Sequence, residues 1–380
     1  MKILMVTWEF PPHKVGGVAS HCYDISRYLA RAGNEVHILS FGNENRTEYQ
    51  DGVTVHRVNC GTAPDIVSWV MVLNYKMQKK GIELCREEGF DVVHAHDWLS
   101  VPATVYLKKS FKVPMVLTLH STEYGRSGIH SPLNKMINDI EWFGTYEANE
   151  VITVGKDFRE EVKNLFSVPE EKLHYIPNGV DLERFRNVRD VRDEFSLDWE
   201  KIVLFVGRLC HQKGVEYLIE AMPETLREHP EAKFVIVGKG ALDHYRKMVY
   251  RKGVDQKVYF TGYVSEEMLM NLYYSADVTV MPSVYEPSGI VAMESMAVRT
   301  PVVASYTGGL KETVVHEWCG LHTYPCDPQS IKWGITTAIN DMTWNRWLGK
   351  NGKKRVEKNY NWDIISKWTY MVYRKAVGEY

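Results

Sequence analysis

The chain lacks the cysteine patterns that disulfide-bonded or zinc-binding proteins need. It has 6 cysteines in 380 residues, with no C-x-x-C pair and no spacing typical of metal ligands. In a large soluble chain, such usage is typical of ordinary reduced thiols. We therefore expect neither a disulfide framework nor a structural zinc site. The six are Cys22, Cys60, Cys85, Cys210, Cys319 and Cys326.

Long apolar runs and an excess of one charge are also missing. No run approaches the ~20 apolar residues of a membrane span. The apolar start, Met1–Val6, stops at Trp8, which suits a buried strand better than a signal peptide. A formal net charge of −2 argues against nucleic acid as a partner. A cytoplasmic enzyme is the simplest interpretation.

Two groups of lysines leave membrane association open. They could bind an anionic membrane surface, but solvated helix faces are favoured. The groups are Lys76, Lys79 and Lys80, and Lys108, Lys109 and Lys112.

What the sequence does contain is a regular alternation of short apolar runs and longer amphipathic stretches. A chain of 380 residues exceeds what one core usually organises, so two domains are expected. The alternation predicts βαβ units and an α/β fold with a doubly wound parallel sheet in each domain. The runs are 3–6, 35–40, 54–58, 92–94, 115–119, 151–154 and 173–176, then 203–206, 233–237, 258–260, 278–281 and 302–304.

A charged, irregular stretch follows Asp181 and lasts to about Trp199. We predict the domain linker there, between a first domain at 1–185 and a second at 200–358. The last segment, 362–380, shows helical spacing of its apolar residues, which are Ile364, Trp368, Met371 and Val372.

The stretch 281–314 is the most informative, because two glutamates straddle an expected helix start. Glu286 precedes it and Glu294 follows eight residues later. The turn at Ser288 and Gly289 would expose unpaired N–H groups and the positive end of a helix dipole, which attract phosphate. At ~1.5 Å per residue, the glutamates lie too far apart along the chain for a glycosidase pair, and they would hold different parts of one ligand.

Two cations leave an expected strand-to-helix junction upstream. Arg208 follows the run 203–206, and Lys213 opens the next helical pattern. Such a pair suits a diphosphate, although a solvated surface pair has the same spacing. In doubly wound sheets, ligands bind beyond the carboxyl ends of the strands, where both residues are expected to lie.

These residues resemble the donor site of retaining glycosyltransferases with the two-domain GT-B fold. Glu286 and Glu294 match the E-x7-E motif, and Arg208 with Lys213 matches the basic pair. The run Thr307-Gly308-Gly309-Leu310 is similar to the glycine turn of the donor pocket. The segments HAHDW (94–98) and TLHSTE (118–123) resemble glycogen and starch synthases, while the compact length is more like glycosyltransferase family 4.

The resemblance implies two Rossmann-like domains that face each other across a deep cleft, with the helix at 362–380 crossing back onto the first. It implies that Glu286 meets the sugar hydroxyls, that Glu294 meets the ribose, and that His120 contacts the donor sugar. The implied catalytic residues are Asp97, His120, Arg208, Lys213 and Glu286. The implied donor-binding residues are Gly16, Gly17, Ser288, Gly289, Ile290, Glu294, Thr307, Gly308 and Gly309.

Structural roles remain as alternatives for several of these residues. Asp97 could cap a helix, and His120 could be a core histidine. Glu286 could serve helix capping, and Glu294 could lie on an exposed helix face. The loop Lys14-Val15-Gly16-Gly17-Val18 is the weakest match, because paired glycines occur in many loops and a valine stands in the leucine position of the synthases.

No metal or other cofactor is expected. The sequence has no D-x-D motif for a catalytic divalent ion. His94 and His96 alternate along an expected strand, and we expect them to point to opposite faces, which argues against a shared metal.

The function we expect is transfer of a hexose, with glucose favoured, from a nucleoside diphosphate sugar such as UDP-glucose or ADP-glucose to an acceptor hydroxyl. The anomeric configuration is kept, and an α-glucan is the first choice of acceptor. A family 4 transferase acting on a lipid, a small sugar or a sugar phosphate is the second choice. A UDP-sugar epimerase shares the architecture and is a third.

Overall fold

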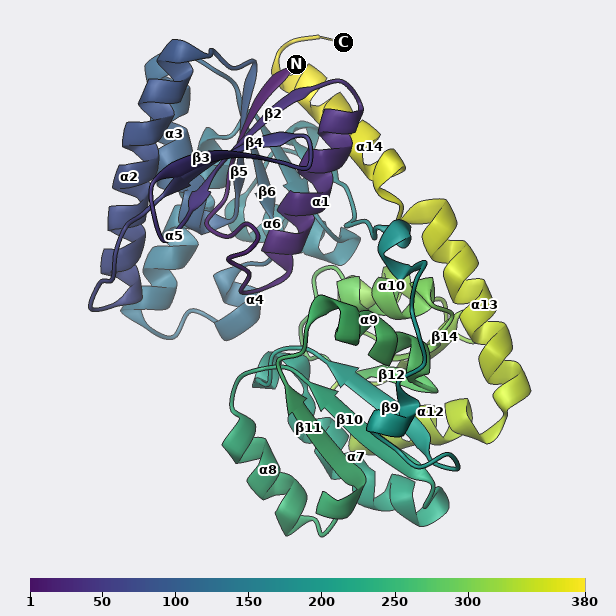
Figure 1. The fold of residues 1–380 in the computed structure, drawn as a ribbon. Helices are drawn as coiled ribbons and strands as arrows, with labels where there is room; N and C mark the ends of the chain where they lie inside the picture. The colour runs from purple at the N-terminus through teal and green to yellow at the C-terminus, as the bar shows by residue number, and fades with distance from the viewer. Residues whose placement is uncertain (380) are drawn as a thin grey trace. The chain divides into compact units, whose positions relative to one another are not determined.

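The computed structural model of the protein describes residues 1–379, which form two compact units (Figure 1). The first unit contains Met1–Asn178 and the segment from Trp362 on, and the second contains Gly179–Asn361. Each unit has a mainly parallel sheet covered by helices, which is the architecture that the alternating apolar runs predict.

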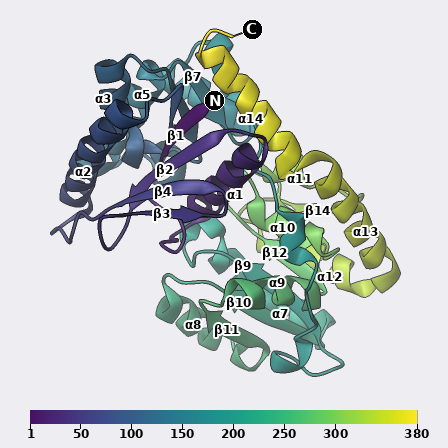
Figure 2. The same cartoon turned by 45° about the horizontal axis from the view of Figure 1, so that its top comes forward.

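In the first unit, eight strands form one sheet in the order β3-β4-β2-β1-β5-β6-β7-β8, and only the β3–β4 pair is antiparallel. Figure 2 shows β1, β2, β4 and β3 of this sheet side by side. The strands are β1 (Lys2–Val6), β2 (Glu35–Phe41), β3 (Arg46–Gln50), β4 (Val53–Val58), β5 (Val92–His96), β6 (Met115–Leu119), β7 (Glu150–Thr153) and β8 (Leu173–Tyr175). The helices are α1 (Gly17–Arg31), α2 (Ile66–Glu87), α3 (Val101–Phe111), α4 (Glu123–Ser127), α5 (Pro132–Glu147), α6 (Lys156–Phe166) and α14 (Trp362–Ala376).

Alternate residues of the strands feed two separate cores, one on each face of this sheet. Leu4 and Val6 of β1 pack into a core with α2, α3 and α6, while Ile3 and Met5 pack into a core with α1 and α14. This follows from the two-residue period of a strand. Figure 1 shows α2 and α3 on one side of the sheet and α1 and α14 on the other, so the sheet is doubly wound.

The second unit repeats the plan with six parallel strands in the order β11-β10-β9-β12-β13-β14. The strands are β9 (Lys201–Val206), β10 (Ala232–Val237), β11 (Val258–Gly262), β12 (Val278–Met281), β13 (Val302–Ser305) and β14 (Gly320–Thr323). The helices are α7 (Val215–Glu228), α8 (Leu242–Arg251), α9 (Glu266–Ser275), α10 (Ile290–Ala297), α11 (Leu310–Thr313), α12 (Pro328–Asn340) and α13 (Met342–Asn359).

Every apolar run expected to form a strand does so, but the sequence does not reveal β3 and β14. Strand β3 reads RTEYQ and is largely exposed, so it has no buried face to produce a hydrophobic pattern. Strand β14 reads GLHT and is only four residues long. Both lie at sheet edges, and each pairs with a single neighbouring strand.

The expected linker at 182–199 is wrong. Phe185 and Val191 are buried in a core of the second unit, and Arg192 donates to the carbonyl oxygens of Glu200 and Ser275 and to the carboxylate of Asp277. Arg192 therefore bonds to the second unit instead of facing solvent in a linker. The boundary between the units lies at residues 178 and 179.

Three of the surface lysines noted above, Lys80, Lys108 and Lys109, form ion pairs with acidic neighbours. Lys109 Nζ lies 2.6 Å from Glu147 Oε1, and Lys80 Nζ lies 3.3 Å from Glu83 Oε2. These contacts favour solvated helix faces over a membrane surface. Over residues 1–379, no helix combines the length and apolar character that crossing a bilayer requires.

Candidate active site

Three loops of the second unit meet where the neighbouring strands β9, β12 and β13 end. The amides of Val284 and Tyr285, after β12, donate to the carbonyl oxygen of Gln212, after β9, at 2.9 and 3.4 Å. The amide of Gly309, after β13, donates to the carbonyl oxygen of Glu286 at 2.8 Å. Backbone bonds therefore hold the three loops together at the edge of the sheet where ligands bind in doubly wound folds.

Lys213 and Glu286 form an ion pair within this junction. Lys213 Nζ lies 2.5 Å from Glu286 Oε2, which also accepts a hydrogen bond from Ser283 Oγ at 3.2 Å. Glu286 is only 8% exposed, so its charge needs these partners. The pair places one cation and one carboxylate next to the glycine turn.

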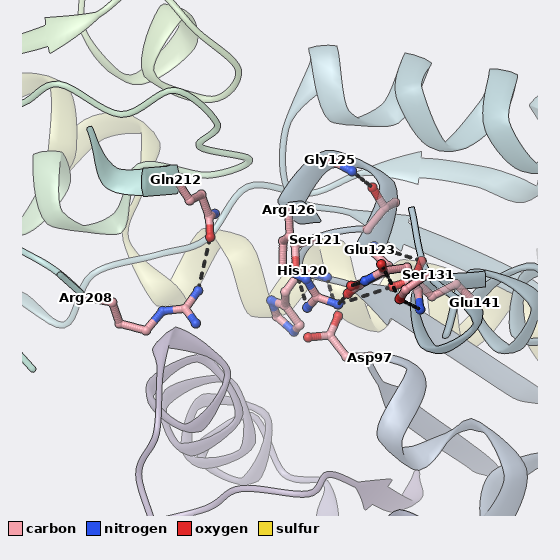
Figure 3. Close-up of polar contacts among 12 residues, drawn as sticks. Asp97, His120, Ser121, Glu123, Gly125, Arg126, Ser131, Glu141, Arg208 and Gln212 are labelled. Atoms are coloured by element: carbon pink, nitrogen blue, oxygen red, sulfur yellow. Dashed lines mark hydrogen bonds and ion pairs between the residues drawn. The ribbon is translucent and has the colours of Figure 1, made fainter. Parts of the chain in front are cut away.

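Arg208 has a different environment from Lys213. Its side chain is exposed, and Nη2 donates to Gln212 Oε1 at 3.2 Å (Figure 3). Gln212 Nε2 in turn donates to the carbonyl oxygen of Tyr285 at 3.3 Å. Gln212 thus links the guanidinium to the loop after β12, a role that the sequence motifs do not reveal.

Glycines permit the loops to touch. A Cβ on Gly308, where φ is +44°, would lie 2.3 Å from the carbonyl oxygen of Glu286, and one on Gly309 would lie 2.5 Å from that of Pro287. At Gly214, where φ is +65°, a Cβ would lie 1.9 Å from the carbonyl oxygen of Pro282. Only glycine fits such close backbone approaches.

Helix α10 begins at Ile290, after Gly289 in the left-handed conformation, where the sequence predicted a helix start. Glu294 lies in its second turn and accepts a hydrogen bond from Tyr273 Oη at 2.8 Å. The hydroxyl of Thr307 donates to the carbonyl oxygen of Val284 at 3.2 Å, which ties the glycine turn to the loop after β12. The donor-binding roles of Ser288, Gly289, Ile290, Glu294, Thr307, Gly308 and Gly309 stay predictions.

In the first unit, Asp97 and His120 follow the neighbouring strands β5 and β6. Asp97 Oδ1 accepts a hydrogen bond from the amide of His120 at 2.7 Å, and its side chain makes no helix-capping bond. Burial raises the pKa of Asp97 to about 6, so the carboxylate is ionised at neutral pH. Burial lowers the pKa of His120 to about 3, so the imidazole is neutral there.

The expectation that His94 and His96 point to opposite faces is wrong. Residues two apart on a strand share a face, and the centroids of these rings lie 4.1 Å apart. His94 contacts Thr118 Oγ1 at 2.8 Å and Tyr373 Oη at 2.7 Å. His96 Nδ1 lies 3.2 Å from His120 Nε2. The histidines therefore form a chain of buried contacts from α14 towards His120.

His21 of α1 adds a fourth imidazole beside His94, His96 and His120. Its ring centroid lies 4.6 Å from that of His120, and its Nδ1 lies 2.6 Å from Asn178 Oδ1. Ligand atoms of His21, His96 and His120 all lie within 4.8 Å of one another, so these three imidazoles could hold a metal ion. The sequence argument against a metal at His94 and His96 thus loses its basis, and metal-independent transfer stays a prediction.

A buried cluster of charges lies behind Asp97 (Figure 3). Arg126 Nη2 lies 2.8 Å from Glu123 Oε2 and 3.7 Å from Glu141 Oε1, and Nη1 donates to Ser121 Oγ at 3.0 Å. Burial raises the pKa of Glu141 to about 8. One guanidinium thus faces several carboxyl groups, which agrees with Glu141 holding its proton at neutral pH.

The glycine loop after β1 is organised by Glu9. The amides of Val15 and Gly16 donate to Glu9 Oε2 at 2.5 and 2.9 Å, and burial raises the pKa of this carboxyl. Helix α1 begins at Gly17. An internal carboxyl group therefore takes two of the loop amides, and phosphate binding at Gly16 and Gly17 stays a prediction.

The sequence motifs did not point to Glu9, His21, Arg126, Glu141 or Gln212. Only Gln212 had a signal, since it lies between the two predicted cations. His21 and Glu141 have partners on other elements of the fold, whereas Glu9 bonds amides of its own loop and Arg126 bonds Glu123 of its own helix.

Comparison with known proteins shows the family to which the chain belongs. The model of Glycosyltransferase Family 4 matches residues 15–184, and that of Glycosyl transferases group 1 matches residues 189–355. An uncharacterized glycosyltransferase of Methanocaldococcus jannaschii is 43% identical, with 99% of each chain covered. The chain belongs to the glycosyltransferases.

Two further relatives have named activities or solved structures. A glycogen synthase of Mycobacterium tuberculosis is 32% identical over 99% of this chain and 95% of its own. The solved sucrose-phosphate synthase of Thermosynechococcus elongatus is 28% identical, with a TM-score of 0.86 and 98% of each chain covered. The glycosyltransferase therefore has the GT-B fold class that the motifs predicted.

Proposed function

We propose that the protein is a retaining hexosyltransferase that moves glucose from a nucleoside diphosphate glucose to an α-glucan. The observation that carries this proposal is the Lys213–Glu286 ion pair, held 2.5 Å apart beside the Gly308–Gly309 turn at the carboxyl ends of neighbouring strands. The glycogen synthase relative and the segments at 94–98 and 118–123 support an α-glucan acceptor.

The chemistry requires that negative charge on the departing diphosphate be stabilised while positive charge develops at the anomeric carbon. Lys213 and Arg208 supply fixed positive charge, and the start of α10 supplies amide N–H groups and the positive end of a dipole. Groups that are already in place before the reaction act most strongly, because little reorganisation is needed when charge develops. Gln212 keeps the Arg208 guanidinium near the loop.

Glu286 is proposed to accept hydrogen bonds from the hydroxyls of the transferred sugar. Since Lys213 neutralises this carboxylate in the structure, donor binding would let the ammonium turn towards phosphate while sugar hydroxyls take its place.

The first unit is proposed to supply His120 and Asp97 to the sugar. A neutral imidazole can donate or accept a hydrogen bond without adding charge near the reacting carbon. Asp97 is ionised at neutral pH and can accept bonds from sugar hydroxyls, while its other partner, the amide of His120, keeps the two side chains in register.

We propose that transfer needs no metal ion. Two fixed cations meet the charge that a divalent ion offsets in other transferases, and no D-x-D motif occurs in the sequence. No organic cofactor is needed, because the nucleotide sugar is itself the activated donor.

A sugar phosphate is the second candidate acceptor. The sucrose-phosphate synthase, whose name specifies a phosphorylated product, is 28% identical across nearly the whole chain. Transfer to a phosphorylated acceptor would use the same donor residues.

Incubation with radiolabelled UDP-glucose or ADP-glucose and glycogen tests the proposal. We expect label in polymer, and release of that label by an α-specific exoglucosidase would establish retention. Label in a small phosphorylated sugar supports the second candidate. Nucleotide release without transfer to any fraction, or a product resistant to the α-specific enzyme, contradicts the proposal.

A further inference from the structure

A cavity of about 620 Å³ in the second unit has no part in the proposed donor chemistry. It lies beyond the carboxyl ends of β13 and β14, which end at Ser305 and Thr323. Tyr306 lines it and directly precedes Thr307, so the cavity adjoins the glycine turn. Its size is in the range of about 300 to 1,000 Å³ that is typical of small-molecule sites.

Large aromatic side chains surround the cavity and stay in contact with water. Tyr306 is 56% exposed, Tyr324 is 74% exposed and Trp333 is 42% exposed. Single exposed aromatics are common on protein surfaces, but a group around one hollow indicates a binding site.

Hydrogen bonds fix the wall that carries these rings. The amide of Tyr324 donates to Ser330 Oγ at 2.9 Å, and Asp327 Oδ1 caps α12 by accepting from the amides of Gln329 and Ser330. Trp333 lies in the same helix. Little conformational entropy would therefore be lost when a ligand binds between the rings.

Another part of the lining, formed by Tyr306 and His322, is held by a ring contact and a hydrogen bond. The ring of Tyr306 meets that of His322 edge to face, with centroids 5.0 Å apart. His322 Nε2 donates to the carbonyl oxygen of Val314 at 3.0 Å, and burial lowers the pKa of His322, so the ring is neutral at neutral pH.

The polar groups of the cavity suit hydroxyls better than anions. Asp327 is the one acidic side chain of the lining in the described part of the chain, and no lysine or arginine lines it. Lys311 lies close by, with Nζ 5.2 Å from the centroid of the Tyr306 ring. Thr323 is 3% exposed, and its Oγ1 has no hydrogen-bond partner within residues 1–379. A buried hydroxyl without a hydrogen-bond partner costs folding free energy unless a ligand or a water molecule supplies the missing bond.

We propose that this cavity is a subsite for a neutral α-glucan chain, an inference that rests on the proposed glucan acceptor. Sugar rings present C–H groups that pack on the electron-rich faces of aromatic rings, and hydroxyls that bond to groups such as Thr323 and Asp327. Occupation of this subsite holds a polymer on the second unit and raises its local concentration during successive transfers.

Titration of the full-length protein with maltohexaose, without nucleotide, tests the subsite by calorimetry. We expect Trp333→Ala and Tyr324→Ala each to weaken binding by about tenfold, which corresponds to ~1.4 kcal/mol. Thr323→Val should also weaken it without loss of thermal stability, because the variant removes a hydroxyl that has no partner. Tyr250→Ala is the matched control, since Tyr250 is 75% exposed on α8 of the same unit and does not line the cavity.

Kinetics separate failure of the subsite from failure of the proposed function. The cavity variants should raise the KM for glycogen at unchanged kcat and leave the KM for the nucleotide sugar unchanged. Wild-type transfer to glycogen with unaltered maltohexaose binding in all three variants overturns the subsite alone. A second outcome is that the variants weaken maltohexaose binding but the wild type transfers no glucose to glycogen. This result overturns the proposed function and leaves the cavity as a glucan-binding site. Absence of maltohexaose binding to the wild type overturns the subsite.

Discussion

At the scale of single residues, burial decides which charges the site keeps. Glu286 is 8% exposed, and Lys213 Nζ lies 2.5 Å from its Oε2. Glu141 is fully buried and shares Arg126 with Glu123, and burial raises the pKa of Glu141 to about 8. The two glutamates thus differ in their partners, since one has an ammonium group to itself and the other shares a guanidinium.

Lys213→Ala removes the cation that is proposed to meet the departing diphosphate. We expect kcat for glucose transfer to fall about 100-fold, because a positioned charge at the leaving group is lost. Lys252→Ala is the control, since Lys252 forms an ion pair with Glu220 and touches none of the three site loops. Initial rates with saturating donor measure the effect, and equal rates for the two variants would contradict the assignment.

Glu141→Gln tests the proton on Glu141. A folded-state pKa of about 8, above the ordinary value of 4.5, means that the folded protein binds a proton that the unfolded chain releases between these values. Wild-type stability is therefore lost as pH rises from 4.5 to 8, whereas the glutamine variant lacks this loss. We expect the variant to gain about 5 kcal/mol relative to wild type across that range, since each pKa unit of the shift corresponds to ~1.4 kcal/mol.

Urea unfolding midpoints at mildly acidic and mildly alkaline pH give this comparison. Glu87→Gln, on the exposed end of α2, is the control and should follow the wild-type profile. A constant difference between Glu141→Gln and wild type at every pH would show that Glu141 is already ionised in the folded protein.

At the scale of elements, two short segments hold parts of the site in place. Helix α14 is far from β5 in sequence, yet Tyr373 Oη lies 2.7 Å from His94 Nδ1, and Ile365 is fully buried. In the second unit, the glycine turn after β13 touches the loop that carries Glu286. The glycine turn leaves no room for a bulkier side chain, because a Cβ would meet the neighbouring backbone. The contact between Tyr373 and His94 requires α14 to keep its position on the sheet.

Ile365→Ala should cost about 2 to 5 kcal/mol of the stability of the first unit, because it opens a cavity between α14 and the sheet. Met371→Ala on the same helix is the control, since Met371 is 59% exposed and should change stability by less than about 0.5 kcal/mol. Urea unfolding followed by far-UV circular dichroism measures both, and similar midpoints for the two variants would show that α14 adds little to the core.

Gly309→Ala should abolish most transfer, because its Cβ would lie 2.5 Å from the carbonyl oxygen of Pro287 and push the loops apart. Gly253→Ala is the control for glycine replacement: φ is +67° there, but no atom lies within 4 Å of the new Cβ. The control should lose about 1 to 2 kcal/mol of stability and keep normal kinetics. Transfer by Gly309→Ala at the wild-type rate would show that the loop contact is dispensable.

At the scale of the whole molecule, the chain passes between two independently packed units twice, at residues 178–179 and 361–362. Each unit has its own sheet and its own pair of cores. Enzymes built from two domains often close around a ligand, and we predict such closure for this chain.

Saturation with the nucleotide sugar should therefore reduce the radius of gyration measured by small-angle X-ray scattering. The physical reason is that the ligand gains contacts only when residues of both units meet it. Lys213→Ala at the same ligand concentration should show less compaction. An unchanged radius of gyration, with saturation confirmed by calorimetry, would contradict closure.

The sequence alone determined the fold class. Every strand with an apolar run was found, because buried parallel strands need continuous hydrophobic residues. The sequence also indicated which residues lie at the junction after β9, β12 and β13, because each depends on local order along the chain: a carboxylate before a helix start, a cation after a strand, and glycines where backbones meet. Their roles in donor binding stay predictions.

Only the tertiary structure decided which groups are charged and what holds them. Gln212 and Glu141 gave no motif, since they have partners on another loop or helix. The charged stretch after Asp181 looked like a linker because composition does not show that Arg192 has carbonyl and carboxylate partners on the second unit. Local pattern records the conformation of a segment, but burial and pairing depend on residues brought together by folding, and these set the pKa values of Asp97, His120 and Glu141.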